Sequence, residues 1–303
     1  MKRFGTLLLM LVACGRPTNV GHEGELPKET RSTGPDGHLS LRYLGVAGWE
    51  IDDGNHALLV DPYFSRPDAR EGNPVLVPDT GAIARYAPLD ADLILISHSH
   101  YDHAMDAPAI ALHSHAAIAG TESTLNLARA SGVPEASLIL AAPKAKITRG
   151  PFEAQVFEGL HSLTGQKNEP IPRDVHVPLH ANDYGEGGTL QYLVKVEGHT
   201  VFFVGSANFV EGAIMGQKPD IAVVAVGLRE KIPEYTCRLM HALGNPKVVL
   251  ANHFDAFWNP VGPKEMDIDD DAKKSLAAFA DEVHACSPDT KVTVPEHFQK
   301  FPL

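Results

Sequence analysis

Apolar and polar positions along the chain predict strands and helices in alternation. Short segments that alternate apolar and polar side chains, or are continuously apolar, predict β-strands. They lie at residues 39–44, 49–51, 56–60, 92–96, 116–119, 152–157, 189–196, 200–204, 221–226, 247–251 and 291–294. Helices are predicted at residues 106–112, 123–130, 233–243 and 270–285. A Gly-Val-Pro stop follows the second helix, and three aspartates at the start of the last one favour its N-terminus.

The order of these elements predicts an α/β protein with one folded domain from residue 38 to residue 303. Strand, helix and strand follow in series, which is typical of layered α/β folds. Two layers of strands with helices outside are the simplest arrangement, so we expect a four-layer αββα sandwich. Two long polar segments rich in Pro and Gly, residues 65–88 and 163–188, interrupt the pattern. The first is a candidate lid or rim segment.

The start of the chain is typical of an export signal. A basic beginning precedes an apolar run that is too short to span a bilayer. The run ends in Leu11-Val12-Ala13-Cys14, which resembles the lipobox of bacterial lipoproteins, where the cysteine is lipidated after cleavage. We therefore expect a signal peptide at residues 1–13, a lipid anchor at Cys14 and a flexible tether at residues 14–37. An ordinary secretory signal with a chance cysteine is the alternative.

Both interpretations predict an exported protein, and the first predicts one that is lipid-anchored in the bacterial cell envelope. The residue after the cysteine is Gly15 and not the aspartate that resembles an inner-membrane retention signal, so an outer-membrane anchor is preferred. Two further cysteines, Cys237 and Cys286, could pair in an oxidising compartment. Two buried free thiols are the alternative, because the sequence does not show how far apart the two Cα atoms lie.

Composition restricts the partners that we expect. The formal net charge is −12 and no basic run is present, which argues against a nucleic-acid polymer bound through its phosphates. The sequence has no apolar stretch long enough for a transmembrane helix, and its acidic balance would not hold it to an anionic membrane. We therefore expect membrane association only through the lipid anchor at Cys14.

A histidine-rich stretch follows the apolar segment 92–96. His98 and His100 project from the same side of an extended chain, because side chains alternate faces. Asp102 and His103 join them only if the chain turns after Tyr101. Nitrogen and oxygen ligands gathered at the end of one strand predict a metal site, and zinc suits them. A histidine-rich surface turn is the alternative, but the spacing H-x-H-x-D-H at a strand end favours metal binding.

Further candidate ligands follow later strands. His161 comes after the strand at 152–157, Ser206 after the strand at 200–204, and His253 after the strand at 247–251. Because sites in layered α/β folds gather at strand ends, we expect these loops to converge on one edge.

From about residue 38 onward, this pattern resembles the metallo-β-lactamase fold of metal-dependent hydrolases. The resemblance implies two zinc positions, the first held by His98, His100 and His161 and the second by Asp102, His103 and His253. It also implies that Asp61 supports the site without binding metal itself. The sequences Tyr43-Leu44-Gly45, Asp61-Pro62-Tyr63 and His253-Phe254-Asp255 are most similar to the branch that contains ascorbate-6-phosphate lactonases and N-acyl phosphatidylethanolamine phospholipase D.

One residue departs from that family. Family members usually carry an aspartate that bridges both metals after the glycine of this hairpin, and this chain has Gly205-Ser206. A neutral hydroxyl is a poor zinc ligand compared with a carboxylate or an imidazole. We therefore predict a firmly held first metal and a second one that is either weakly held or bridged to the first by hydroxide alone. Manganese is an alternative to zinc.

These residues predict a hydrolase that uses a metal-activated water, with Asp102 orienting that water or accepting its proton. The expected substrate is a small-molecule or lipid-like phosphodiester or lactone-like ester. Ser206, His180 and Asp255 are candidates either for supporting the site or for contacting substrate. Asp255 and Trp258, which follow the last candidate ligand, are candidates for shaping the pocket. A β-lactamase-type amidase is disfavoured by the residues around Asp61 and His253. The alternative outside enzymes is a non-catalytic metal-binding or ligand-binding lipoprotein, in which Ser206 marks lost turnover.

Overall fold

The computed structural model describes residues 39–165, 168–262, 266 and 268–303. All of them belong to one compact unit of the chain, Arg31–Leu303. The expected signal peptide, Cys14, the tether and residue 38 lie outside the described residues. In the described part of the chain, no helix is both long enough and apolar enough to cross a membrane.

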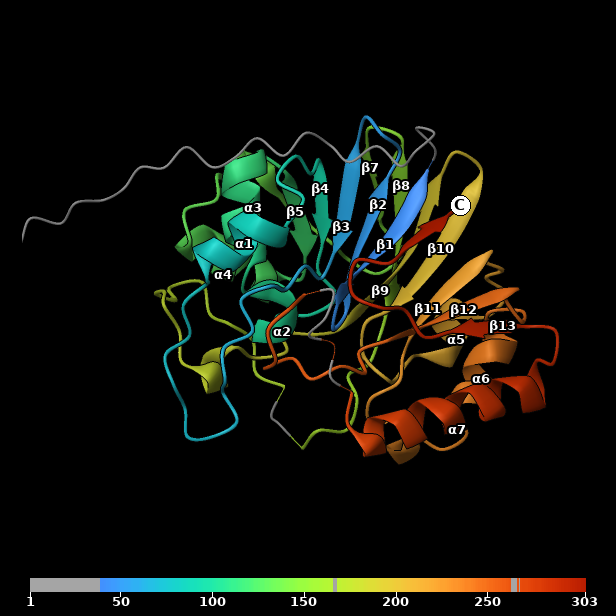
Figure 1. Cartoon of the computed structure of the whole chain (residues 1–303). Helices are drawn as coiled ribbons and strands as arrows, with labels where there is room; N and C mark the ends of the chain where they lie inside the picture. The colour runs from blue at the N-terminus through green and yellow to red at the C-terminus, as the bar shows by residue number, and fades with distance from the viewer. Residues whose placement is uncertain (1–38, 166–167, 263–265, 267) are drawn as a thin grey trace, which may run out of the picture. The chain divides into compact units, whose positions relative to one another are not determined.

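Two mixed β-sheets, each with seven strands among the described residues, lie face to face (Figure 1). The first has the spatial order β14 (Lys300–Pro302), β1 (Ser40–Gly45), β2 (Gly48–Asp52), β3 (Ala57–Val60), β4 (Leu93–Leu95), β5 (Ala117–Gly120) and β6 (Leu138–Leu140). The second has the order β13 (Lys291–Thr293), β12 (Val248–Asn252), β11 (Ile221–Ala225), β10 (His199–Val204), β9 (Leu190–Val196), β8 (Phe152–Glu158) and β7 (Lys146–Arg149). Strands β3 to β6 are parallel to one another, as are β10 to β13.

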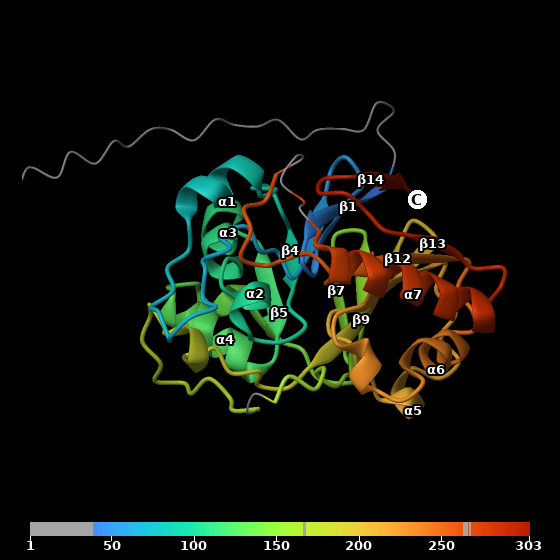
Figure 2. The ribbon, with the colours of Figure 1, turned by 60° about the horizontal axis from the view of Figure 1, so that its bottom comes forward.

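Helices cover the outer face of each sheet, on opposite sides of the pair (Figures 1 and 2). Beside the first sheet lie α1 (Thr80–Tyr86), α2 (Tyr101–Ala104), α3 (Ala107–Ser114) and α4 (Glu122–Ala130). Beside the second lie α5 (Glu211–Ile214), α6 (Tyr235–Ala242) and α7 (Asp270–Cys286). Short 3-10 helices, η1 (Glu135–Ser137), η2 (Ala181–Asp183) and η3 (Arg229–Lys231), lie in connecting loops. The predicted αββα sandwich is confirmed.

Buried apolar side chains fill the space between adjacent layers. On β4, Leu93 packs between the two sheets and Ile94 packs toward the helices. On β11, Val223 packs between the sheets and Val224 packs toward α6 and α7. Because successive side chains of a strand point to opposite faces, a strand that is covered on both faces needs a continuous apolar run. This explains why these two segments show no polar alternation.

The structure corrects several predicted elements. The segment 65–88, expected to be a loop, contains α1, whose N-cap Asp79 accepts hydrogen bonds from the backbone N–H groups of Gly81 and Ala82. Strands β6, β7 and β14 were not predicted. All three lie at sheet edges and are only partly buried, so their sequences carry a weak apolar pattern.

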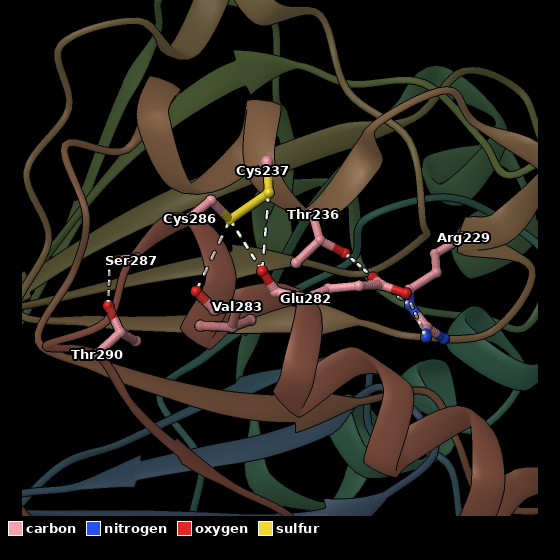
Figure 3. Close-up of a disulfide and its surroundings, with 8 residues drawn as sticks. All are labelled: Arg229, Thr236, Cys237, Glu282, Val283, Cys286, Ser287 and Thr290. Carbon is pink, nitrogen blue, oxygen red and sulfur yellow. Dashed lines mark hydrogen bonds and ion pairs between the residues drawn. A yellow bond between two sulfur atoms is a disulfide. The ribbon is translucent and has the colours of Figure 1, made fainter.

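A disulfide joins α6 to α7 (Figure 3). It links Cys237 to Cys286, whose Cα atoms lie 5.5 Å apart, so the alternative of two free thiols is wrong. Next to it, the Glu282 carboxylate accepts hydrogen bonds from Arg229 on η3 and from Thr236 on α6 (Figure 3). Together these links hold α7 against both neighbouring elements.

Candidate metal centre

The loop after β4 brings four candidate ligands together. Its start is fixed because the Ser97 carbonyl accepts a hydrogen bond from the Leu190 N–H of β9 at 2.8 Å. The next turn makes His100 the N-cap of α2, the short helix that contains the other candidates of this stretch. The chain therefore turns at the start of α2, as it must for Asp102 and His103 to join the two preceding histidines. The residues gathered at this edge of the first sheet are His98, His100, Asp102 and His103.

His98, His100 and His161 form a first group, in which one ring nitrogen from each lies within 4.8 Å of the others. His98 Nε2 and His100 Nδ1 are 3.1 Å apart. Two imidazole nitrogens bound to one tetrahedral zinc at ordinary Zn–N lengths would be about 3.3 Å apart. His161 Nδ1 lies 2.8 Å from the Ser162 carbonyl oxygen, which leaves its Nε2 for the group. The spacing fits one shared metal ion.

Burial keeps the three imidazoles of this first group neutral. Desolvation, reinforced by the neighbouring histidines, places the pKa of His98 well below its ordinary value. The pKa values of His100 and His161 fall to about 4, mainly through burial. A neutral imidazole offers a lone pair, and this is the form that binds metal.

Asp102, His103 and His253 form a second group on the same 4.8 Å criterion. The Asp102 Oδ2 atom lies 3.2 Å from His253 Nε2 and 3.5 Å from His103 Nε2. Burial raises the pKa of Asp102, but the imidazoles of His103 and His253 outweigh that effect and bring it below its usual value. The second group therefore offers one carboxylate and two imidazoles.

His103 Nε2 is the clearest sign that the second group lacks a partner. This atom is buried and has no hydrogen-bond partner. Buried polar atoms without partners are rare in folded proteins, because leaving such an atom without a hydrogen bond costs free energy. A metal ion between His103, Asp102 and His253 would satisfy the nitrogen, so the donor set fits a metal.

Asp61 lies behind the second group and orients it. Its side chain is fully buried, and Oδ2 is 2.9 Å from His103 Nδ1. The same carboxylate accepts hydrogen bonds from the Ser97 backbone N–H at 2.7 Å and the Ser97 hydroxyl at 2.6 Å. A Cβ at Gly205 would lie 2.6 Å from the Ser97 Oγ atom and 2.9 Å from Asp61 Oδ2, so this close approach requires glycine. A carboxylate of this kind fixes the ring of a metal-binding histidine.

Ser206 has a positioning role that the sequence did not show. Its buried hydroxyl accepts a hydrogen bond from the Ser162 backbone N–H at 2.9 Å and lies 3.2 Å from the Ser162 hydroxyl. Asn208, in the same turn, donates from Nδ2 to the His161 carbonyl at 3.0 Å. Ser206 and Asn208 thus hold the backbone that carries His161. The family pattern alone does not reveal this positioning role.

Asp255 organises the loop that carries His253. Its carboxylate accepts hydrogen bonds from the Tyr43 hydroxyl at 2.6 Å and the Val46 N–H at 2.8 Å. Two more partners are Arg66 Nη2 at 3.0 Å and His297 Nε2 at 2.9 Å. The His253 N–H donates to the Val46 carbonyl at 2.7 Å. The side chain of Asp255 is thus occupied by structural partners. Sequence analysis missed Arg66 and His297, which lie in loops without a recognisable motif.

A cavity of about 1180 Å³ opens onto both groups of candidate ligands. Its wall includes His100, Asp102, His161 and His253 together with Ser206 and the loop at 253–258. His180 is exposed, and its Nδ1 lies 2.8 Å from the Asn73 carbonyl oxygen. Its neighbours Ala181 and Asn182 are among the described residues that line the cavity, and His180 is not. The cavity also has an aromatic wall formed by Tyr101, Tyr184, Phe257 and Trp258. Sequence analysis named only Trp258 as a pocket residue, because the other rings come from segments without a recognisable motif.

Known proteins share this fold and its sequence pattern. A relative from Heliobacterium modesticaldum, named UPF0173 metal-dependent hydrolase, is 23% identical over 277 residues, which cover 86% of this chain and 99% of the relative. A relative of the same name from Caldivirga maquilingensis is 23% identical over 221 residues, which cover 72% of this chain and 82% of the relative. Igni18, a metallo hydrolase from Ignicoccus hospitalis, has a TM-score of 0.58 at 18% identity, covering 88% of this chain and 98% of its own.

The family match decides the classification. The family described as "Beta-lactamase superfamily domain" matches residues 40–253, from the start of β1 to the last candidate ligand. This range covers more than half of the chain and includes both groups of candidate ligands. The chain therefore belongs to the β-lactamase superfamily and has the metallo-β-lactamase fold.

Proposed function

We propose that this protein is a metal-dependent hydrolase that cleaves a phosphodiester or a lactone-like ester with a metal-activated water. The observation that carries the proposal is the pair of donor groups at one cavity, with the buried His103 Nε2 left without a hydrogen-bond partner. The relatives named metal-dependent hydrolases support the same reaction class. The class of bond that is cleaved is inferred only from the sequences around Asp61 and His253, which resemble those of the lactonase and phospholipase D branch.

The donors suit zinc, with manganese as the alternative. His98, His100 and His161 would hold a first ion and leave one position open, and Asp102, His103 and His253 would hold a second. Such an ion, when bound, supplies Lewis acidity and brings the pKa of water down to about 7.

The side chains of this chain perform the remaining tasks. Asp102 is ionised at neutral pH, so it can accept a hydrogen bond or a proton from the attacking water. Asp61 holds the ring of His103, while Ser206 and Asn208 hold the backbone at His161.

Ser206 leads us to propose unequal metal affinities. The first group has three neutral nitrogens and needs no bridging anion. The second group lacks the bridging carboxylate that would offset repulsion between two dications, because residue 206 is a serine. The hydroxyl of Ser206 is moreover bonded to the Ser162 N–H. Metal analysis of purified protein should show one firmly retained ion per chain. Two tightly retained zinc ions per chain would contradict this proposal.

The reaction is tested with chromogenic phosphodiester, lactone and β-lactam substrates, assayed with added zinc or manganese. We expect turnover of a phosphodiester or a lactone and none of the β-lactam. His161→Ala should abolish turnover with the circular dichroism spectrum unchanged, whereas His113→Ala, at an exposed histidine of α3, should leave turnover intact. Full activity of His161→Ala would count against the assignment.

A non-catalytic metal-binding or ligand-binding protein is the second candidate, and Ser206 in place of the bridging aspartate favours it. The two candidates differ in the substrate panel. No turnover of any class by metal-loaded protein would favour the binding protein, and turnover above that of His161→Ala would exclude it.

We also propose that the protein is exported and lipid-anchored at Cys14 in the bacterial cell envelope. The sequence before Cys14 supports this proposal, and so does the disulfide between α6 and α7, because disulfides persist mainly in oxidising compartments. Fractionation of cells that express the wild type or Cys14→Ala tests it. The wild type should be in the membrane fraction and the variant should be released; equal distributions would contradict the anchor.

A further inference from the structure

A row of four aromatic rings forms one wall of the cavity, beginning beside a candidate ligand. The ring centroids of His253 and Phe257 lie 6.2 Å apart, and those of Phe257 and Trp258 lie 4.9 Å apart. Phe257 also meets Tyr101 at 6.0 Å, and Tyr101 meets Tyr184 at 6.1 Å. Each pair meets edge to face, and all four residues line the cavity. This wall offers apolar contact to a substrate held at the metal ligands, and it offers π-faces beyond the one at Trp258, where the Arg70 guanidinium already lies 5.2 Å from the ring centroid.

The charged side chains elsewhere in the cavity are mostly acidic. They come from η3, from α7 and its N-cap, and from the loop before η2, none of which supplies a candidate metal ligand. The acidic residues among these are Glu169, Glu230, Asp269, Asp271 and Glu282.

Both basic residues that line the described cavity are paired with carboxylates. Arg229 is buried, and its Nη2 and Nε atoms each lie 3.0 Å from an oxygen of Glu282. Lys274 Nζ lies 3.1 Å from Asp271 Oδ1. These two pairs cancel in charge, so the excess of negative charge away from the candidate ligands rests on the other acidic side chains of the described lining, of which Asp269 also accepts a hydrogen bond from the Ala272 N–H of α7.

Within the acidic side of the cavity, Glu282 and the helix α7 that carries it are held in place before any substrate binds. The disulfide fixes α7 to α6, and Arg229 donates through Nη1 to the Ser275 hydroxyl at 2.7 Å (Figure 3 shows the disulfide with Arg229 and Glu282). Groups held in this way do not need to be ordered when a ligand arrives, which makes their charge effective in selection.

We propose that the cavity selects esters with a bulky apolar substituent that is cationic or uncharged, and rejects esters whose substituent is anionic. Aromatic faces and carboxylates both attract a cation such as a quaternary ammonium group, and the carboxylates repel an anion. The selection acts on the substituent and not on the bond that is cleaved, because η3 and α7 supply no candidate ligand. This inference rests on the proposed hydrolase function and adds the charge class of its substrate.

The test uses three esters of one scaffold that differ only in a para substituent: tert-butyl, trimethylammonium or sulfonate. The first two have nearly the same shape but differ in electron withdrawal, so each kcat/KM is divided by the rate constant of the same ester with free hydroxide, and the normalised values isolate charge. We expect kcat/KM of the metal-loaded full chain to fall in the order cation, neutral, anion, with cation and anion about tenfold or more apart at low ionic strength. The difference should shrink at about 1 M salt, where the Debye length is about 3 Å.

Two neighbouring aspartates provide a matched pair of variants. Asp270 and Asp271 both lie in the first turn of α7, both are exposed, and each is paired with a lysine three residues on, at 3.3 Å and 3.1 Å. Asp271 lines the cavity, and Asp270 is not among its lining residues. Asp271→Asn should lower the cation-to-anion ratio of kcat/KM by about two- to threefold, the size expected for one solvent-screened charge. Asp270→Asn should leave the ratio unchanged.

Binding gives a readout that does not depend on turnover. Trp258 lies in the aromatic wall and Trp49 is fully buried, so quenching of tryptophan fluorescence by uncleavable ether analogues should report occupancy of the cavity. The cationic analogue should bind more tightly than the anionic one. Equal affinities would overturn the inference, as would equal kcat/KM values or a preference for the anion. Absence of turnover for all three esters, with the cationic analogue still bound preferentially, would contradict the proposed hydrolase function and leave the charge selection standing.

Discussion

At the residue scale, the centre depends on side chains that never reach the cavity. Asp61 is one of these, because its carboxylate holds both His103 and the backbone after β4. Asp61 and His253 also adopt positive φ angles of 44° and 51°, which are uncommon for residues other than glycine. Such backbone strain persists where the surrounding contacts fix it, and the bonds of Asp255 and Val46 around His253 are contacts of this kind.

Removing the Asp61 carboxylate should weaken metal binding at the second group. In Asp61→Ala the ring of His103 loses the partner of its Nδ1 atom, and losses of such partners typically lower metal affinity by about 10- to 100-fold. Titration calorimetry with zinc measures the effect, and Asp270→Asn serves as the control for a lost surface carboxylate. Unchanged affinity in Asp61→Ala would show that the ring does not need this support.

Ser206→Asp should strengthen the second metal site. The new carboxylate would stand where family members carry the bridging aspartate and would offset repulsion between two dications. We expect the weaker zinc dissociation constant to fall by about tenfold or more, read from the same calorimetric titration. Ser206→Asn, which has nearly the same shape without the charge, is the matched control. If both variants bind the second zinc like the wild type, Ser206 does not limit that site.

At the element scale, the sequence pattern predicted most strands and helices because their apolar runs are long and buried. Strands β4 and β11 are examples, since both are covered on two faces. Edge strands β6 and β14 escaped prediction because burial, which creates the pattern, is partial there. The turn into α2 was expected only because Asp102 and His103 had to meet the two preceding histidines.

The link between α6 and α7 gives a stability prediction. Cys237 and Cys286 are separated by 49 residues, and a crosslink of that span typically stabilises a protein by about 2–4 kcal/mol. Replacing both cysteines with serine should lower the free energy of unfolding by that amount in urea denaturation. Reducing agent should lower the stability of the wild type and leave that of the variant unchanged. Equal stability of the oxidised wild type and the variant would contradict the prediction.

At the scale of the whole folded unit, the candidate centre lies where the two sheets meet. The first sheet supplies His98, His100, Asp102 and His103, and the second supplies His161 and His253. The Tyr192 hydroxyl on β9 also donates to the Ile96 carbonyl at 2.7 Å, which ties the sheets together beside the site. Metal binding should therefore stabilise the packing of one sheet on the other.

The sequence could predict the donors but not everything that holds them. The H-x-H-x-D-H motif and the strand ends identified all six residues that the structure brings together. Ser206 was predicted as a lost ligand and as a candidate supporting or substrate-contacting residue. Its bond to Ser162 could not be predicted, because that bond depends on the distance between two loops far apart in sequence. Asp255 was expected to support the site or to shape the pocket, and it lines the cavity. Its bonds to Arg66 and His297 could not be predicted, because these partners carry no motif.

Thermal denaturation tests whether metal ties the sheets together. A ligand that binds only the folded state at about 100 times its dissociation constant stabilises it by about 2.7 kcal/mol. Added zinc should therefore raise the Tm of metal-free wild type by several degrees, and it should raise the Tm of His98→Ala/His161→Ala less. The same rise in both proteins would place the binding elsewhere on the chain.

The metal content of the folded protein tests the account most directly. Purified wild type, loaded with zinc or manganese and dialysed, is analysed by mass spectrometry for metal per chain beside His98→Ala/His161→Ala. We predict at least one retained ion per wild-type chain and none in the variant, with the same circular dichroism spectrum for both. A folded wild type that retains no metal, or a variant that retains as much as the wild type, would contradict the account.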